Sequence, residues 1–207
     1  MVNELSHPLV TELINRLRKV DISANTFRQT LKELTRILCY EAFEQMHLHN
    51  KPIKTWLGLH QFEFLNQQDI VAVPIMRAGL PMLEALEILL PDSPSGFLAM
   101  KRDEETHIAK TYYNRIPDCQ GKTVMILDPM VATGGSLNDA IDLIKQQNPK
   151  RIITLNIIGS PEGIKAVTDK HPDVQINIAK IDERLDSNKF IYPGLGDAGD
   201  RAFNTVE

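Results

Sequence analysis

The sequence has few cysteines and little excess charge of either sign. Only 2 of its 207 residues are cysteines, Cys39 and Cys119, and they lie far apart. Neither the CxxC spacing of metal and redox sites nor the dense pattern of a disulfide-stapled domain is present, so we interpret both as reduced thiols. The formal net charge is −4, so binding of nucleic acid through bulk electrostatics is not favoured. Any anion-binding site must therefore be built from a few local groups.

Long apolar runs are also lacking. Residues 1–19 carry charges throughout and have no apolar core of a signal peptide. No stretch reaches the roughly 20 apolar residues that a membrane-spanning helix needs. We therefore expect a soluble, cytoplasmic protein. Hydrophobic residues make up 43% of the chain, which argues against disorder, and the length suits one domain with its own core.

The N-terminal quarter has the apolar spacing of helices. One helix is expected to begin near Pro8, with Ser6 as its N-cap, and a second near Thr26, with Gln29 completing a capping box. The second helix has an apolar stripe formed by Phe27, Leu31, Leu34, Leu38, Ala42 and Met46. His47 and His49 would diverge on a helix, so joint metal binding is not expected.

From residue 69 onward, short apolar runs alternate with helical patterns. Strands are expected at residues 69–75, 95–101, 123–127, 151–158 and 174–181, and helices at 80–90, 137–144 and 161–171. Residues 107–115 are polar and are interpreted as an exposed arm. This alternation predicts an α/β fold, a mostly parallel sheet with helices on both faces.

The strongest local signal is the turn Leu127-Asp128-Pro129-Met130-Val131-Ala132-Thr133-Gly134-Gly135-Ser136, between a buried strand and an amphipathic helix. Ligands of open α/β sheets bind at the carboxyl ends of strands, where a helix start presents free N–H groups. Gly134 and Gly135 allow close approach of backbone to an anion, and Thr133 and Ser136 add hydroxyl donors. The turn is therefore a candidate phosphate site.

Two other interpretations of this turn are possible from its glycines. The first, a Walker A loop, is excluded because no lysine follows the glycines. The second is an ordinary glycine turn in which Ser136 caps the helix. Asp128 favours the ligand site, since a carboxylate beside bound phosphate must face something else, and a pair of sugar hydroxyls suits it.

The stretch 127–136 resembles the PRPP-binding signature of type I phosphoribosyltransferases, in the form used by the uracil branch. Three more segments resemble that branch in the same order: PIMRAGL at 74–80, RDEET at 102–106 and YPGLGDAGDR at 192–201. The resemblance implies transfer of a phosphoribosyl group from PRPP to uracil, giving UMP and pyrophosphate, a pyrimidine salvage reaction. It further implies one domain over 1–207, in which residues 1–68 and 182–207 form a hood over the strand ends.

The resemblance also implies cofactors and partners. Mg²⁺ would be held mainly by PRPP and water rather than by direct protein ligands. The protein would be a homodimer or higher homo-oligomer, with GTP as a possible effector and with neither nucleic acid nor membrane as a partner. Residues 103–115 are interpreted as an arm that closes over the donor.

The same resemblance assigns the site residues. The catalytic set is Asp128, Arg102 and Asp197. The substrate-binding set comprises Arg77 and Arg102 for pyrophosphate, Asp128 for the ribose hydroxyls, and Ala132, Thr133, Gly134, Gly135 and Ser136 for the 5′-phosphate. Pro129, Met130 and Val131, within the same signature, are also assigned to substrate binding. Ile191, Tyr192, Gly196, Asp197 and Ala198 complete the set around the base.

Some positions distinguish among relatives. Pro129 stands where many type I relatives carry a second acid, which favours uracil over purines. Tyr192, Lys101, Met76, Val131 and Asp186 depart from the commoner pattern, and Tyr192 and Lys101 bear on base choice and activity.

Three rival functions, a regulator, a purine phosphoribosyltransferase and an NAD-binding oxidoreductase, are less well supported by the sequence. A non-catalytic regulator such as the pyrimidine attenuation proteins would need a basic face for RNA, which the net acidity disfavours. A purine phosphoribosyltransferase is disfavoured by Pro129 and the tail. Gly194-x-Gly196-x-x-Gly199 matches the dinucleotide fingerprint, but it lies too near the chain end for a βαβ unit.

Overall fold

An eight-stranded sheet forms the centre of the computed structural model, which describes residues 1–44, 46–102 and 109–205, with backbone alone at 101, 102 and 109–111. The order is β1-β10-β9-β7-β4-β5-β6, with β8 paired to β9. All neighbours are parallel except β5 and β6. The strands are β1 Val2–Glu4, β4 Ile70–Met76, β5 Phe97–Arg102, β6 Ala109–Arg115, β7 Thr123–Leu127, β8 Met130–Val131, β9 Arg151–Gly159 and β10 Gln175–Ile181.

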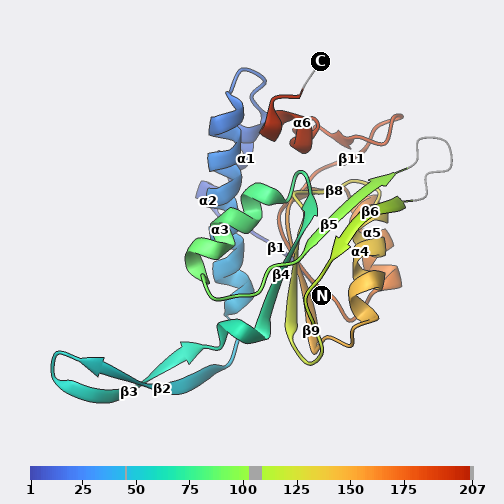
Figure 1. Cartoon of the computed structure of the whole chain (residues 1–207). Coiled ribbons are helices and arrows are strands. Elements are labelled where there is room, and N and C mark those ends of the chain that lie inside the picture. The colour runs from blue at the N-terminus through green and yellow to red at the C-terminus, as the bar shows by residue number, and fades with distance from the viewer. Residues whose placement is uncertain (45, 103–108, 206–207) are drawn as a thin grey trace.

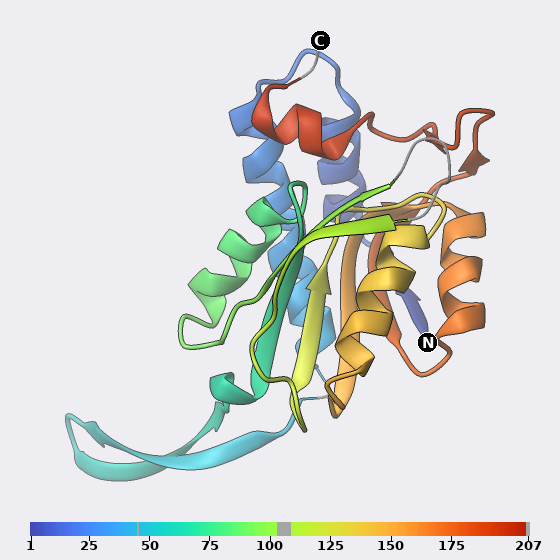
Figure 2. The ribbon, with the colours of Figure 1, turned by 45° about the vertical axis from the view of Figure 1, so that its right-hand side comes forward.

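Helices cover both faces of this sheet, as Figures 1 and 2 show. One face carries α1 (Pro8–Arg18), α2 (Ala24–Phe43) and α3 (Leu80–Leu89). The other carries α4 (Gly135–Lys145) and α5 (Pro161–Lys170). The predicted fold class, a mostly parallel α/β sheet with helices on both faces, is confirmed.

Successive side chains of β7 point to opposite faces of the sheet, and both faces are covered by helices, which explains why its sequence is a continuous apolar run. Met125 and Leu127 face the cluster formed with α1, α2 and α3, whereas Val124 and Ile126 face the cluster under α4 and α5. All four side chains are fully buried. A strand covered on both faces has no solvent-facing position, which is typical of parallel sheets.

Two of the predicted helix starts differ in detail. Pro8 is the first residue of α1, as expected, but the N-cap is His7, whose Nδ1 accepts from the N–H of Leu9 at 3.1 Å. Helix α2 begins at Ala24, because Ser23 accepts from the N–H of Thr26 at 3.1 Å. The expected Ser6 cap and the box from Thr26 to Gln29 are therefore wrong, while Phe27 and the leucines of the stripe are buried as predicted.

A β-hairpin replaces helix after α2. β2 (Leu48–Thr55) and β3 (Gly58–Leu65) pair antiparallel and project from the body of the molecule (Figure 1). His49 therefore lies on a strand and His47 just before it, not on a helix. The turn at Gly58 has φ +113°, which a side chain would strain, so this glycine is the signal that the helical interpretation overlooked.

The expected polar arm is part of the sheet. Residues 109–115 form β6, which pairs with β5, and Tyr112 and Tyr113 are exposed. Residues 103–108 lie outside the described part of the chain. Sequence reasoning also missed β1, β8 and the short elements η1 (Gln67–Asp69), β11 (Arg184–Leu185), β12 (Ile191–Tyr192) and α6 (Ala198–Phe203).

The carboxyl ends of the strands lie where α6 meets the connection between α1 and α2 (Figure 1). Arg28 of α2 donates to the carbonyl oxygen of Ala202 at 2.6 Å, which joins the two segments. The hairpin of β2 and β3 extends from the opposite end of the molecule (Figure 2). The single domain with a hood from 1–68 and 182–207 stays a prediction. Among the described residues, no helix combines the length and apolarity required to cross a membrane.

Candidate active site

A cavity of about 770 Å³ opens at the carboxyl ends of the central strands. Its wall is formed by residues at the end of β4, in the turn after β7, in β5 and β6, and in α6. Predicted site residues on its wall are Arg77, Asp128, Met130, Val131, Ala132, Thr133, Gly134, Gly135, Ser136 and Asp197. Ala99, Met100, Tyr112, Gly199 and Asp200 also line it and were missed from the sequence.

Asp128 follows β7 and is almost completely buried, with 8% of its surface exposed. Burial raises the pKa of this carboxyl to about 7, although the Met130 N–H, which donates to Oδ1 at 3.3 Å, opposes the rise. The Asp128 carbonyl oxygen accepts from Asn156 Nδ2 at 2.7 Å. Asn156 of β9 thus fixes the backbone at the end of β7, and Asp128 lies at the cavity wall.

The turn after Asp128, residues 129–136, is named here the phosphate loop. Its carbonyl oxygens are held by β9 and the residue after it: Pro129 O accepts from Ile158 N at 2.9 Å, and Val131 O from Ser160 N at 3.0 Å. Ala132 O accepts from the buried Ser160 Oγ at 2.6 Å. Because these carbonyl oxygens accept hydrogen bonds from residues 158 and 160, the path of the loop is fixed by the neighbouring segment.

The end of the phosphate loop requires glycine. Gly134 has φ +77° and caps α4, and a Cβ there would lie 2.7 Å from the Gly163 carbonyl oxygen of α5. Ser136 is inside the first turn of α4, so the alternative in which it caps the helix is wrong. The first turn of an α-helix presents N–H groups without helical acceptors, and here it faces the cavity.

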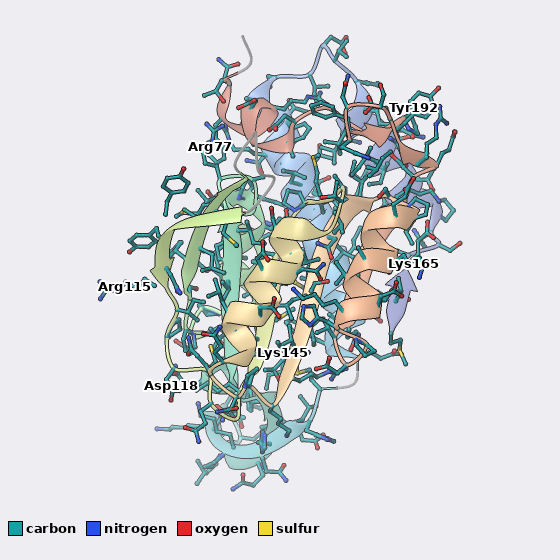
Figure 3. All side chains as sticks on the ribbon, turned by 90° about the vertical axis from the view of Figure 1, so that its right-hand side faces the viewer. Arg77, Arg115, Asp118, Lys145, Lys165 and Tyr192 are labelled. Carbon is teal, nitrogen blue, oxygen red and sulfur yellow. The ribbon has the colours of Figure 1, made fainter. Side chains whose placement is uncertain are left out.

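Arg77 follows β4 directly and is 52% exposed. Its Nη2 lies 2.7 Å from Asp200 Oδ1, and its Nη1 donates to Thr205 Oγ1 at 3.2 Å. The Thr205 hydroxyl and Arg77 hold the pKa of Asp200 below its usual value. Figure 3 shows Arg77 and Tyr192 at the same end of the molecule. Asp200 and Thr205 were missed, and the acidic first turn of α6 is the signal that could have found Asp200.

The last segment, residues 191–197, is named here the tail loop. Asp197 caps α6 by accepting from the N–H of Asp200 at 2.9 Å, and its side chain is exposed. Ile191 is buried in the core, whereas the Tyr192 ring lies under the Arg184 guanidinium at 4.1 Å. Ile191, Tyr192, Gly196 and Ala198 do not line the cavity, nor does Pro129. Their assignment to substrate binding stays a prediction.

Arg102 is the final residue of β5, and its backbone pairs with Ala109 of β6. The side chains of Arg102 and Lys101 lie outside what the structure describes, as do residues 103–108. In the described part of the chain, no group of three His, Cys, Asp or Glu side chains is placed to hold a metal ion.

Known proteins match the chain over nearly its whole length. The family model for uracil phosphoribosyltransferase matches residues 4–205. A curated uracil phosphoribosyltransferase from Aquifex aeolicus is 45% identical over 203 residues, covering 98% of each chain. One from Wolinella succinogenes is 43% identical over 205 residues, covering 99% of each.

A solved structure of a protein from Aquifex aeolicus has the same fold, with a TM-score of 0.95, 45% identity and 98% of each chain covered. The fold, the turn after β7 and the agreement along the sequence lead to one conclusion. The chain belongs to the uracil phosphoribosyltransferase family.

Proposed function

We propose that this chain transfers the 5-phosphoribosyl group of PRPP to uracil, giving UMP and pyrophosphate. The observation that carries the proposal is the phosphate loop, which opens on one cavity together with the buried Asp128 and the exposed Arg77. Relatives at 45% and 43% identity are named for this activity.

The donor would lie along the strand ends. The N–H groups of the first turn of α4, with the hydroxyls of Thr133 and Ser136, suit a 5′-phosphate because the helix dipole favours an anion there. Asp128 would accept hydrogen bonds from the two ribose hydroxyls. The guanidinium groups of Arg77 and Arg102 suit a diphosphate, since each can donate two parallel hydrogen bonds.

The chemical problem is charge separation at C1′ of the ribose. Negative charge grows on the departing pyrophosphate, and Arg77 and Arg102 would stabilise it by donating hydrogen bonds that strengthen as the charge develops. When bound, Mg²⁺ would supply further neutralisation of the diphosphate. Because Mg²⁺ prefers phosphate oxygens, hydroxyls and water as ligands, we propose that it is held mainly by PRPP and water, with Asp197 on the same cavity wall.

The acceptor would lie against the tail loop. Backbone N–H and C=O groups of Gly196 and its neighbours, with Ile191, Tyr192, Asp197 and Ala198, would match the donor and acceptor edge of a flat pyrimidine. A base with the wrong pattern leaves buried polar groups unpaired, which costs about 1–3 kcal/mol for each. Among the side chains that the structure describes, no histidine or lysine lines the cavity, and we propose that alignment of the two substrates supplies much of the rate gain.

A non-catalytic regulator on this fold is not favoured, because the relatives with near-complete coverage are named as enzymes and the net charge of −4 disfavours RNA. We further propose a cytoplasmic homodimer or higher homo-oligomer of single-domain chains, with a hood from 1–68 and 182–207. The family resemblance also suggests GTP as an effector.

The test is UMP formation from PRPP with uracil, cytosine, hypoxanthine and guanine, each with and without Mg²⁺. Turnover that needs uracil and rises with Mg²⁺ is the expected result. Saturable PRPP binding without turnover on any base would overturn the proposal and favour the regulator. Turnover on a purine would instead remove the role given to Pro129.

A further inference from the structure

A buried ion pair lies beneath the tail loop. Arg18, the last residue of α1, donates through Nη2 to Asp182 Oδ1 at 2.6 Å and through Nη1 to Asp182 Oδ2 at 2.9 Å. The Asp182 side chain is 2% exposed and the Arg18 side chain 22%. The two residues are 164 positions apart, so the pair connects the first helix with the end of β10.

The same two side chains hold both backbone groups of Gly194. Its carbonyl oxygen accepts from Arg18 Nη1 at 2.6 Å, and its N–H donates to Asp182 Oδ2 at 3.0 Å. Gly194 has φ +63°, and a Cβ there would lie 2.1 Å from the Ile191 carbonyl oxygen. The backbone at this residue is therefore fixed by two charge-assisted hydrogen bonds, at a position that has no room for a Cβ.

A second arginine, Arg201, binds the carbonyl oxygen of the next residue, Leu195. Arg201 Nη1 donates to the Leu195 carbonyl oxygen at 2.6 Å and also to that of Leu17, while Nη2 donates to that of Lys19. Its guanidinium lies 4.6 Å from the centre of the Phe27 ring. The C-terminus of α1 thus fixes the tail loop at Gly194 and at Leu195.

Neither Arg18 nor Asp182 lines the candidate active-site cavity, so neither is placed to touch the donor. Attachment of α1 to the body does not depend on them, because Val10, Leu13, Ile14 and Leu17 are buried in the core. A buried ion pair adds little net stability compared with apolar packing, since desolvation offsets the attraction. What the pair does specifically is set the path of the backbone that leads into Gly196 and Asp197.

We propose that Arg18 and Asp182 are positioning residues for the acceptor base. This inference rests on the proposed function, because it takes the tail loop to be the pyrimidine-binding loop. By holding Gly194, the pair aligns the backbone N–H and C=O groups that follow it with the edge of uracil. The phosphate loop is held by β9 and Ser160 instead, so the donor site is independent of the pair.

The experiment compares steady-state kinetics of Arg18→Met, Asp182→Asn and the double variant with those of the wild-type enzyme. KM for uracil is expected to rise about ten-fold or more, because small misplacements of a binding group are costly, while KM for PRPP stays within about two-fold. Arg18→Lys is expected to recover part of the loss. Arg16→Met is the matched control, since Arg16 lies on α1 but pairs only with exposed Glu12 and Glu33 among the described residues.

Folding is separated from positioning by two measurements. The double variant leaves no unpaired buried charge, so it keeps the test valid where Arg18→Met unfolds. Hydrogen exchange at the Gly194 amide is expected to accelerate in each variant, whether or not the enzyme turns over. Equal losses for uracil and PRPP, or unchanged exchange at Gly194 in a folded variant, would overturn the proposal. A wild-type chain that is inactive with every base, but whose tail loop loosens in the variants, would refute the proposed function alone.

Discussion

The phosphate loop and the tail loop lie at the same end of the sheet but are held in different ways. In the phosphate loop, Pro129, Val131 and Ala132 are fixed by backbone and one serine of the neighbouring segment, 157–160. In the tail loop, Gly194 is fixed by the charged side chains of Arg18 and Asp182. Both loops contain a glycine with positive φ whose Cβ would meet a backbone oxygen.

The difference shows which parts of the sequence determine the conformation of each loop. A loop held by sheet backbone depends mainly on strand order, because the N–H groups of residues 158 and 160 supply two of its partners whatever their side chains, and only Ser160 Oγ is specific to the sequence. A loop held by arginine depends on one side chain at one distant position, 176 residues away in the case of Arg18 and Gly194. Loss of that side chain leaves a buried carboxylate without its partner, which costs more than loss of a neutral backbone hydrogen bond.

The largest effect is expected from breaking the backbone-held loop at its glycine. Gly134→Ala places a Cβ 2.7 Å from the Gly163 carbonyl oxygen at φ +77°, so the loop or α5 must move. We expect kcat/KM for PRPP to fall by about 100-fold or more, the scale of losing a charge-stabilising donor. Steady-state kinetics and calorimetric titration with PRPP measure it.

Gly121→Ala is the matched control for this change. Gly121 also has positive φ, +69°, but a Cβ there meets nothing within 4 Å. Its alanine variant bears only the backbone strain, about 1 kcal/mol, and should keep its PRPP affinity. Similar losses in both variants would show that strain alone explains the effect and that the phosphate loop has no special role.

The fold was predictable from the sequence wherever one pattern repeated over several residues. The strand at 123–127 was predicted to the residue, because both faces of β7 are buried and turns bound it on each side. The hairpin of β2 and β3 was missed, since its side chains are mostly exposed and burial leaves no clear alternation. The helix caps at His7 and Ser23 depend on local backbone geometry that several nearby polar residues could have supplied.

The site residues that could be predicted from the sequence are likewise those that lie in one short motif. Asp128 and the residues 130–136 form one continuous motif, and the structure places them together on the cavity wall. Asp200 and Thr205 reach Arg77 only because α6 folds back over the end of β4, and Arg18 reaches Gly194 across nearly the whole chain. Such contacts depend on tertiary structure, so no short pattern in one sequence contains them.

An intermediate effect is expected from pH, and it distinguishes Asp128 from the rest of the site. Burial raises the pKa of this carboxyl to about 7, and the ionised form is the better acceptor for ribose hydroxyls. We expect kcat/KM for PRPP to rise about ten-fold from about pH 6 to about pH 8, as the ionised fraction grows. A pH–rate profile of the free enzyme measures this, and Asp128→Asn should lower activity and flatten the profile.

Stability should change with pH in the opposite sense. The folded-state pKa of Asp128 lies above the unfolded value of about 3.9, so the folded chain binds this proton more tightly. The contribution of Asp128 to the free energy of unfolding is therefore greatest below about pH 4 and declines as pH rises to about 7. Urea unfolding of wild type and Asp128→Asn isolates this slope. A wild-type slope that Asp128→Asn leaves unchanged would contradict the assignment.

The smallest effect is expected at the Arg77–Asp200 pair, which lines the same cavity as residues of both loops. Both side chains are partly exposed, 52% and 38%, and exposed pairs contribute up to about 1 kcal/mol. A diphosphate must compete with Asp200 for Arg77, so Asp200→Asn should tighten pyrophosphate inhibition by up to about five-fold, most clearly at low salt. Asp173→Asn is the control, because Asp173 pairs with Lys145 away from the cavity. Weaker pyrophosphate binding in Asp200→Asn would mean instead that Asp200 helps to hold the diphosphate or its metal, and that α6 contributes a ligand to the donor site.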